Sequence, residues 1–154
     1  MKKQLTKTSA IIAISAVLSM TSLFSSTEVR AMAEEAVCCE TETDENLEVL
    51  AHLICGEAQN CSDEEQLYVG SVVLNRVAHS NYPDTIKEVV FQKGQYACTW
   101  DGNYDRTPTE RNWANAAYLL DNGSVLPEDV IYQAGFKQGS EVYIHTKHHY
   151  YCRE

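Results

Sequence analysis

Positive charge is scarce in this 154-residue sequence: 12 Lys and Arg residues stand against 22 Asp and Glu residues, and the formal net charge is −10. Proteins that bind nucleic acid or anionic membranes need basic patches that neutralise phosphate charge. The acidic balance therefore argues against both kinds of partner. It leaves an uncharged sugar polymer open as a substrate.

Metal motifs and long apolar runs are also missing. The sequence contains no HExxH motif and no C-x-x-C pair, the spacings that mark many zinc sites. Its longest apolar stretch, from Ala10 to Phe24, is short and interrupted by Ser and Thr, whereas a membrane-spanning helix needs about 20 mostly apolar residues. We therefore expect no cofactor and no stable membrane partner for the mature chain.

The first 33 residues have the layout of a secretory signal peptide. A basic start is followed by the apolar stretch and by Ala31-Met32-Ala33, a small-residue cleavage site. Cleavage there would change the formal charge from −10 to −13, because residues 1–33 carry four basic residues and one acidic residue. We expect a secreted, cell-wall protein, with an uncleaved N-terminal anchor as the alternative.

Residues 34–46 are dominated by Glu, Thr and Asp, which predicts an acidic flexible leader before a domain over residues 47–154. An even number of cysteines in a small secreted domain favours disulfides, so we expect no more than two free thiols. Six cysteines allow fifteen pairings, and the sequence does not choose among them. The cysteines are Cys38, Cys39, Cys55, Cys61, Cys98 and Cys152.

One carboxylate falls on an apolar helix face. Leu50, Leu53 and Ile54 recur at helical spacing, and the next turn of the same face reaches Glu57. An ionised carboxylate is costly in such a place, and a desolvated carboxylic acid keeps its proton nearer neutral pH, as a general acid must. The alternative is that Glu57 lies at the helix end and reaches water.

Helices come first in the remaining pattern and strands last, so the sequence predicts an α+β domain, mainly helical with a small antiparallel sheet near the C-terminus. Ser62 and Glu65 form a capping-box pattern, and Thr107-Pro108 resembles another helix start. The second helix is apolar on nearly every side, so we expect it to be central. We predict helices over 46–59, 62–78, 85–91 and 107–122, and strands over 130–133, 141–144 and 149–152.

Asn75 and Arg76 interrupt the apolar run near the end of the second helix. Buried polar side chains of this kind need hydrogen-bond partners. Two interpretations stay open: the pair satisfies groups at the helix end, or it supports the acid Glu57 on the first helix.

Several segments, in order, resemble the spore cortex-lytic and cell wall hydrolase family (SleB-type) over roughly Leu50 to Cys152. They are Gly56-Glu57-Ala58, Leu74-Asn75-Arg76, Tyr82-Pro83-Asp84, Gly94-Gln95-Tyr96 and the closing His148–Cys152. The resemblance implies a lysozyme-like domain, related to lytic transglycosylases, that cleaves the glycan strands of peptidoglycan with Glu57 as the catalytic acid/base. Members often have a second acid soon after this glutamate, where this chain has Asn60-Cys61.

The number of acids bears on the reaction. A glycoside hydrolase usually needs two carboxylates, whereas a lytic transglycosylase needs one, because the 6-hydroxyl of muramic acid attacks its own anomeric carbon. Asp63, Glu64 and Asp101 are explained by a helix cap or a turn, and Asp84 does not stand out. We therefore expect Glu57 to act alone and to leave 1,6-anhydro-muramic acid ends. Candidate substrate-binding residues are Gln95, Tyr96, Tyr132 and Tyr151, whose rings and amide suit sugars.

Other functions stay open at this point. A hydrolytic muramidase or glucosaminidase would use the same acid. His145, His148 and His149 could hold zinc in a peptidoglycan amidase, although adjacent histidines on a strand point to opposite faces. A non-catalytic wall-binding module is the third possibility. Oligomeric state, and spore cortex or vegetative wall as substrate, stay undetermined.

Overall fold

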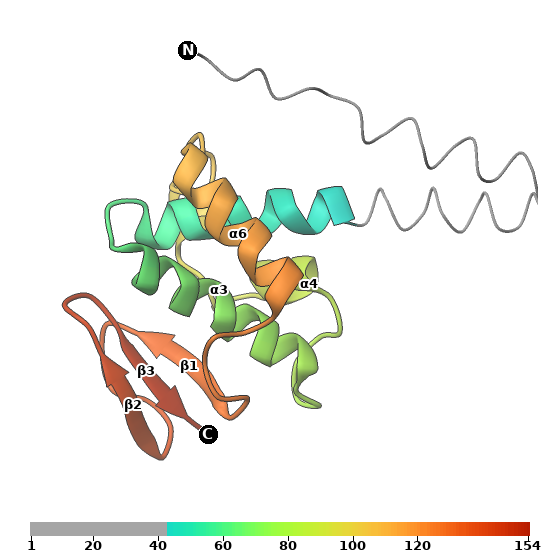
Figure 1. Cartoon of the computed structure of the whole chain (residues 1–154). Coiled ribbons are helices and arrows are strands. Elements are labelled where there is room, and N and C mark those ends of the chain that lie inside the picture. Colours follow the sequence, from blue (N-terminus) through green and yellow to red (C-terminus); the bar gives the residue numbers. More distant parts are fainter. Residues whose placement is uncertain (1–42) are drawn as a thin grey trace, which may run out of the picture. The chain divides into compact units, whose positions relative to one another are not determined.

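The computed structural model describes residues 43–154 (Figure 1). The predicted signal peptide, most of the predicted leader, Cys38 and Cys39 lie outside these residues. The part of the chain predicted as leader that is described, 43–46, is already helical. Glu45 in this turn pairs with Lys87 at 2.5 Å, so the folded domain begins earlier than residue 47.

The first described helix spans residues 43–58. Its predicted inner face is confirmed, since Leu50, Leu53 and Ile54 are fully buried and Leu47 packs against the same core. Burying a leucine or isoleucine side chain contributes about 1.5–3 kcal/mol, so this face anchors the helix.

Helix α3, Asp63–Ala78, is the central element, as the sequence predicts. Figure 1 shows it between the sheet and the other helices, and it contacts α4, α6 and β1. Ser62 caps its first turn by accepting a hydrogen bond from the Glu65 N–H. Gly70 lets three helices meet, because an added Cβ there would lie 2.4 Å from Leu119 of α6 and 3.4 Å from Ile54.

The other helices follow the sequence with two exceptions. Helix α4, Ile86–Phe91, starts at the Thr85 cap, and α6, Glu110–Asn122, ends at Gly123 with φ +82°. The predicted start of α6 at Thr107 is wrong: Thr109 is the N-cap, because the Asn112 side chain completes the capping box there. The second exception is α5, Cys98–Asp101, a single turn in a segment that we expected to be loop.

The predicted C-terminal sheet is confirmed. Strands β1 (Val130–Ala134), β2 (Glu141–His145) and β3 (Tyr150–Arg153) form an antiparallel sheet of order β1-β3-β2. Tyr151 of β3 and Val130 of β1 join the helical core, so the sheet packs on α3 through one face.

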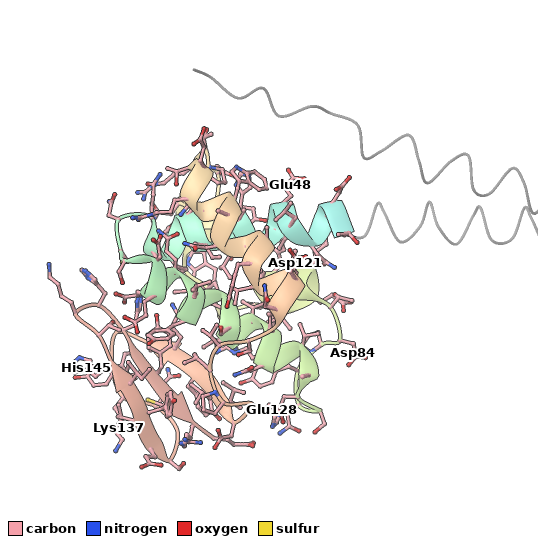
Figure 2. All side chains as sticks on the ribbon, viewed as in Figure 1. Glu48, Asp84, Asp121, Glu128, Lys137 and His145 are labelled. Carbon is pink, nitrogen blue, oxygen red and sulfur yellow. The ribbon has the colours of Figure 1, made fainter. Side chains whose placement is uncertain are left out.

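Acidic side chains lie around the outside of the domain. Figure 2 labels four of them, Glu48, Asp84, Asp121 and Glu128, and all four are exposed. Within residues 43–154, no helix has the length and apolar character needed to cross a membrane.

Candidate active site

Glu57 lies in the last turn of the 43–58 helix and is half-buried. Its neighbours Cys55 and Ala58 are buried, so its side chain leaves the helix at the edge of the core. The backbone N–H of Cys98, at the start of α5, donates a hydrogen bond to Oε1 of Glu57 at 3.3 Å. One carboxylate oxygen, Oε1, is thus held by the backbone of the chain.

Close approach of α5 to the first helix makes this hydrogen bond possible. A Cβ added at Gly56 would lie 2.7 Å from Cβ of Cys98 and 3.1 Å from its Sγ. Real Cβ atoms do not come so close, so any side chain at position 56 would push α5 away from Glu57. Glycine before the glutamate is therefore a requirement of the packing.

The groups around Glu57 are held in their neutral forms. Burial raises the pKa of the Cys98 thiol, and the nearby Glu57 carboxylate raises it further. Burial also raises the pKa of Tyr96 to about 12, with Arg76 opposing the shift and Glu57 adding to it. Neither the thiol nor the phenol thus competes with Glu57 for a proton near neutral pH.

Two buried polar atoms near Glu57 lack hydrogen-bond partners. They are the Tyr96 hydroxyl and Nη1 of Arg76. The Arg76 guanidinium lies 5.2 Å from the ring centroids of both Tyr82 and Tyr96, a cation–π arrangement. Arg76 is thus linked to Glu57 through Tyr96, and its supporting role stays a prediction.

Asn75 has a structural explanation. Its Nδ2 donates to the backbone oxygens of Pro127 at 2.7 Å and Val130 at 3.0 Å. Arg76 Nε donates to the oxygen of Ile131 at 2.8 Å. Both side chains therefore hold β1 and the turn before it against α3, as the first of the two interpretations expects. The hydrogen bonds of Asn75 within residues 43–154 do not reach Glu57.

The four predicted substrate-binding residues do not gather in one exposed groove. Tyr96 is 3 % exposed and Tyr151 is fully buried. A ring without an exposed face cannot stack on a sugar, so that prediction is wrong for these two residues, whose rings belong to the core. Gln95 is exposed beside Tyr96, and Tyr132 is half-buried on β1 against Gly139, so their proposed roles stay predictions.

Another carboxylate, Glu65, is buried, which its pattern in the sequence did not predict. Its side chain does not complete the capping box but turns inward. There, Oε1 accepts a hydrogen bond from Thr146 Oγ1 at 2.6 Å and lies 2.9 Å from His149 Nδ1. The Cys61 thiol lies beside Glu65. Burial raises the pKa of this thiol, and the Glu65 carboxylate raises it further. Positions 60 and 61 thus lack the acid that family members often have there, but the Glu65 carboxylate lies beside Cys61.

The three histidines near the C-terminus do not converge. His149 pairs with Glu65, His145 stacks on Tyr150 with ring centroids 3.8 Å apart, and His148 is exposed. Figure 2 shows His145 at the outer side of the sheet. Within residues 43–154, no three His, Cys, Asp or Glu side chains are grouped so that they could hold a metal ion.

The cysteines differ from the expectation. Cys55, Cys61, Cys98 and Cys152 are all free thiols. The prediction of no more than two free thiols is therefore wrong. Cys55, Cys98 and Cys152 are buried among apolar residues, where a thiol packs like a small hydrophobic side chain.

Comparison with known protein families shows to which family the chain belongs. A family described as Cell Wall Hydrolase matches residues 60–151. The chain belongs to the Cell Wall Hydrolase family. The matched stretch runs from the start of α3 into β3 and begins three residues after Glu57, so the role of Glu57 depends on the Gly56-Glu57-Ala58 resemblance and on the geometry above.

Individual proteins with similar sequences are known. It is 29 % identical over 65 residues to a spore cortex-lytic enzyme of Bacillus cereus, covering 42 % of this chain and 25 % of that protein. It is also 29 % identical over 66 residues to a spore cortex-lytic enzyme of Oceanobacillus iheyensis, covering 43 % and 24 % respectively. The chain thus matches about a quarter of the length of these curated relatives.

Solved structures share its fold. The catalytic domain of the Bacillus cereus SleB protein superposes with a TM-score of 0.62 at 19 % identity, over 71 % of this chain and 91 % of that one. The catalytic domain of the germination-specific lytic transglycosylase SleB from Bacillus anthracis gives 0.60, also at 19 %, over 70 % and 93 %. These likenesses confirm the predicted α+β fold class.

Proposed function

We propose that this protein cleaves the glycan strands of peptidoglycan as a lytic transglycosylase, with Glu57 as its single acid/base. The observation that carries the proposal is the setting of Glu57: a half-buried carboxylate at a helix end, fixed by the Cys98 N–H within a member of the Cell Wall Hydrolase family. Relatives named spore cortex-lytic enzyme and lytic transglycosylase support the same substrate and reaction.

The geometry suits a carboxyl group that first gives a proton and then takes one. With Oε1 held by Cys98, the other oxygen of Glu57 is the one that protonates the glycosidic oxygen as its bond to the anomeric carbon breaks. The 6-hydroxyl of the same muramic acid then bonds to the anomeric carbon and returns its proton to Glu57. One C–O bond breaks, one forms inside the sugar, and no water is consumed.

Three of the four other candidate acids make contacts of their own, which favours internal attack over hydrolysis. Asp63 pairs with Arg111 at 3.3 Å, and Glu64 accepts the Tyr68 hydroxyl at 2.6 Å. Asp101 accepts both the N–H and the side-chain amide of Asn103 at 2.8 Å. A hydrolase usually needs a second carboxylate to activate water or to form a glycosyl intermediate.

The proposed substrate determines where the enzyme must act. An enzyme of this kind must reach the cell wall, so we place it outside the cytoplasmic membrane, brought there by the signal peptide predicted over residues 1–33. The catalytic unit is the part over residues 43–154, which the structure describes.

Mass spectrometry of the fragments released from purified peptidoglycan tests the proposal. Wild-type protein should release fragments ending in 1,6-anhydro-muramic acid, and Glu57→Gln should lower the rate by about 10²–10⁴-fold or more, because glutamine keeps the shape but cannot transfer the proton. Glu64→Gln, on the exposed first turn of α3, is the matched control and should stay active.

Other products would identify other reactions. Fragments with reducing muramic acid ends would show hydrolysis by a muramidase, and fragments with reducing glucosamine ends would show a glucosaminidase. Full activity in Glu57→Gln would remove this residue as the acid. Activity lost to a chelator would indicate a metal-dependent amidase, and no released fragment at all would leave a wall-binding module.

A further inference from the structure

Six large hydrophobic side chains are exposed in the part of the chain that the structure describes. They are Phe91, Trp100, Tyr118, Val125, Phe136 and Tyr143. Only Trp100 belongs to α5, the turn whose first N–H bonds Glu57. It is 61 % exposed, although its indole is the largest apolar group in the set. Single exposed apolar side chains are normal on a protein surface, so the case for binding at Trp100 depends on where this residue lies.

The segment that carries Trp100 is held in place from both ends. Thr99 Oγ1 donates to the oxygen of Tyr96 at 2.9 Å, and the N–H of Tyr104 donates to the oxygen of Cys98 at 3.0 Å. Gly102 turns the chain with φ +86°, while Asp101 holds Asn103 by two hydrogen bonds. The indole is therefore presented by a fixed backbone, so its exposure is not the result of a loose loop.

Trp100 lies within reach of the carboxylate. Cys98, whose N–H touches Glu57, precedes it by two residues, so at most about 7.6 Å of chain separates their Cα atoms. An indole extends several ångströms beyond its backbone. The backbone of Trp100 therefore lies close to the N–H that holds the Glu57 carboxylate.

We infer that the exposed indole of Trp100 is a stacking platform for one sugar ring of the glycan strand, next to the bond that Glu57 cleaves. A tryptophan offers a broad flat apolar face with one N–H at its edge, which fits the C–H face and rim hydroxyls of a pyranose. The net charge of −10 leaves a neutral ring surface as the better target than an anionic group. This inference rests on the proposed function and assigns the sugar contact that Tyr96 and Tyr151 are too buried to make.

Binding measured without turnover tests the platform separately from the chemistry. In a Glu57→Gln background, peptide-free oligosaccharides of alternating N-acetylglucosamine and N-acetylmuramic acid are titrated by calorimetry. Trp100→Ala should weaken their binding by about ten-fold or more, the loss typical of an aromatic hot spot. Trp100→Tyr, which keeps a ring, should recover most of the affinity. Tyr118→Ala on α6, where the ring is 48 % exposed, is the control and should bind as the parent does.

The outcomes separate the two proposals. Unchanged affinity in Trp100→Ala overturns the platform but leaves the proposed function standing. Equal losses in Trp100→Ala and Tyr118→Ala overturn it too, because the effect would then be general to exposed rings. If the Glu57→Gln parent binds no oligosaccharide, both the platform and the proposed function fail.

Discussion

Gly56 and Cys98 touch so closely that the first helix and α5 can meet only with glycine at position 56. A Cβ built on Gly56 would lie 2.7 Å from Cβ of Cys98. The same contact brings the Cys98 N–H to 3.3 Å from Oε1 of Glu57. The glycine thus determines where the carboxylate is held, although it contributes no functional group.

Gly56→Ala should therefore damage activity more than stability. The added methyl group must displace α5, which overpacks the core at a cost of about 1–3 kcal/mol, and it should break the hydrogen bond to Glu57. We expect the rate of peptidoglycan cleavage to fall by about 10-fold or more, since a misplaced catalytic group loses much of its effect. Urea unfolding and fragment release measure the two effects.

Gly135→Ala is the matched control for this substitution. Position 135 has open space around an added Cβ and an ordinary backbone φ. It should leave both rate and stability near the wild-type values. Unchanged activity in Gly56→Ala would show that the Glu57–Cys98 hydrogen bond does not position the acid.

Local patterns in the sequence predicted the elements of the fold. Leu50, Leu53 and Ile54 share one face because the helical period places them there, and burial follows from their chemistry. The strands of the C-terminal sheet were found to within about two residues, because alternation and flanking glycines are also local signals. Glu57 was reached by extending the same helical period.

Side-chain contacts between residues far apart in the sequence could not be predicted from local patterns. Glu65 looked like a capping residue, but its partners Thr146 and His149 lie about eighty residues further along the chain. Tyr96 and Tyr151 looked like groove residues, yet tertiary packing buries them. A tyrosine has the same local pattern in a core and in a groove, so sequence spacing could not separate the two.

The Glu65–His149 pair should contribute measurably to stability. Both side chains are largely buried, at 8 % and 14 % exposure, and they join α3 to the turn between β2 and β3. Glu65→Ala leaves the His149 ring without its partner and the Thr146 hydroxyl with only the longer hydrogen bond to the His149 oxygen. We therefore expect a loss of about 1–3 kcal/mol in the free energy of unfolding. A double-mutant cycle with His149→Ala measures the coupling between the two residues.

Glu64→Ala, one position earlier on the exposed side of α3, provides the comparison. Its loss should be below about 1 kcal/mol, as for exposed polar contacts. A coupling energy near zero in the Glu65–His149 cycle would mean that the hairpin is held to α3 by apolar packing alone.

The free thiols can be counted and ranked. Non-reducing peptide mapping after alkylation in denaturant should find Cys55, Cys61, Cys98 and Cys152 all modified. In the native protein at pH 8, iodoacetamide should leave Cys98 unmodified longest, because burial and then Glu57 raise its pKa and the thiolate is the reactive form. Half-buried Cys61 should react first. A disulfide between any two of the four would contradict this arrangement.

Tyr96→Phe should change how stability depends on alkaline pH. The Tyr96 hydroxyl is buried without a hydrogen-bond partner, so its removal at pH 7 should leave the free energy of unfolding unchanged or higher. Burial raises the pKa of Tyr96 to about 12, against about 10 in an unfolded chain. Between these values the unfolded chain releases the proton while the folded chain keeps it, so stability falls as pH rises.

This contribution of Tyr96 is fully present below pH 10 and should have fallen by about 1 kcal/mol at pH 11, from one pKa unit of differential ionisation. Phenylalanine does not titrate, so Tyr96→Phe should lose less stability than wild type between pH 9 and 11 in urea unfolding. Equal losses in the two proteins would show that the phenol ionises at the same pH folded and unfolded.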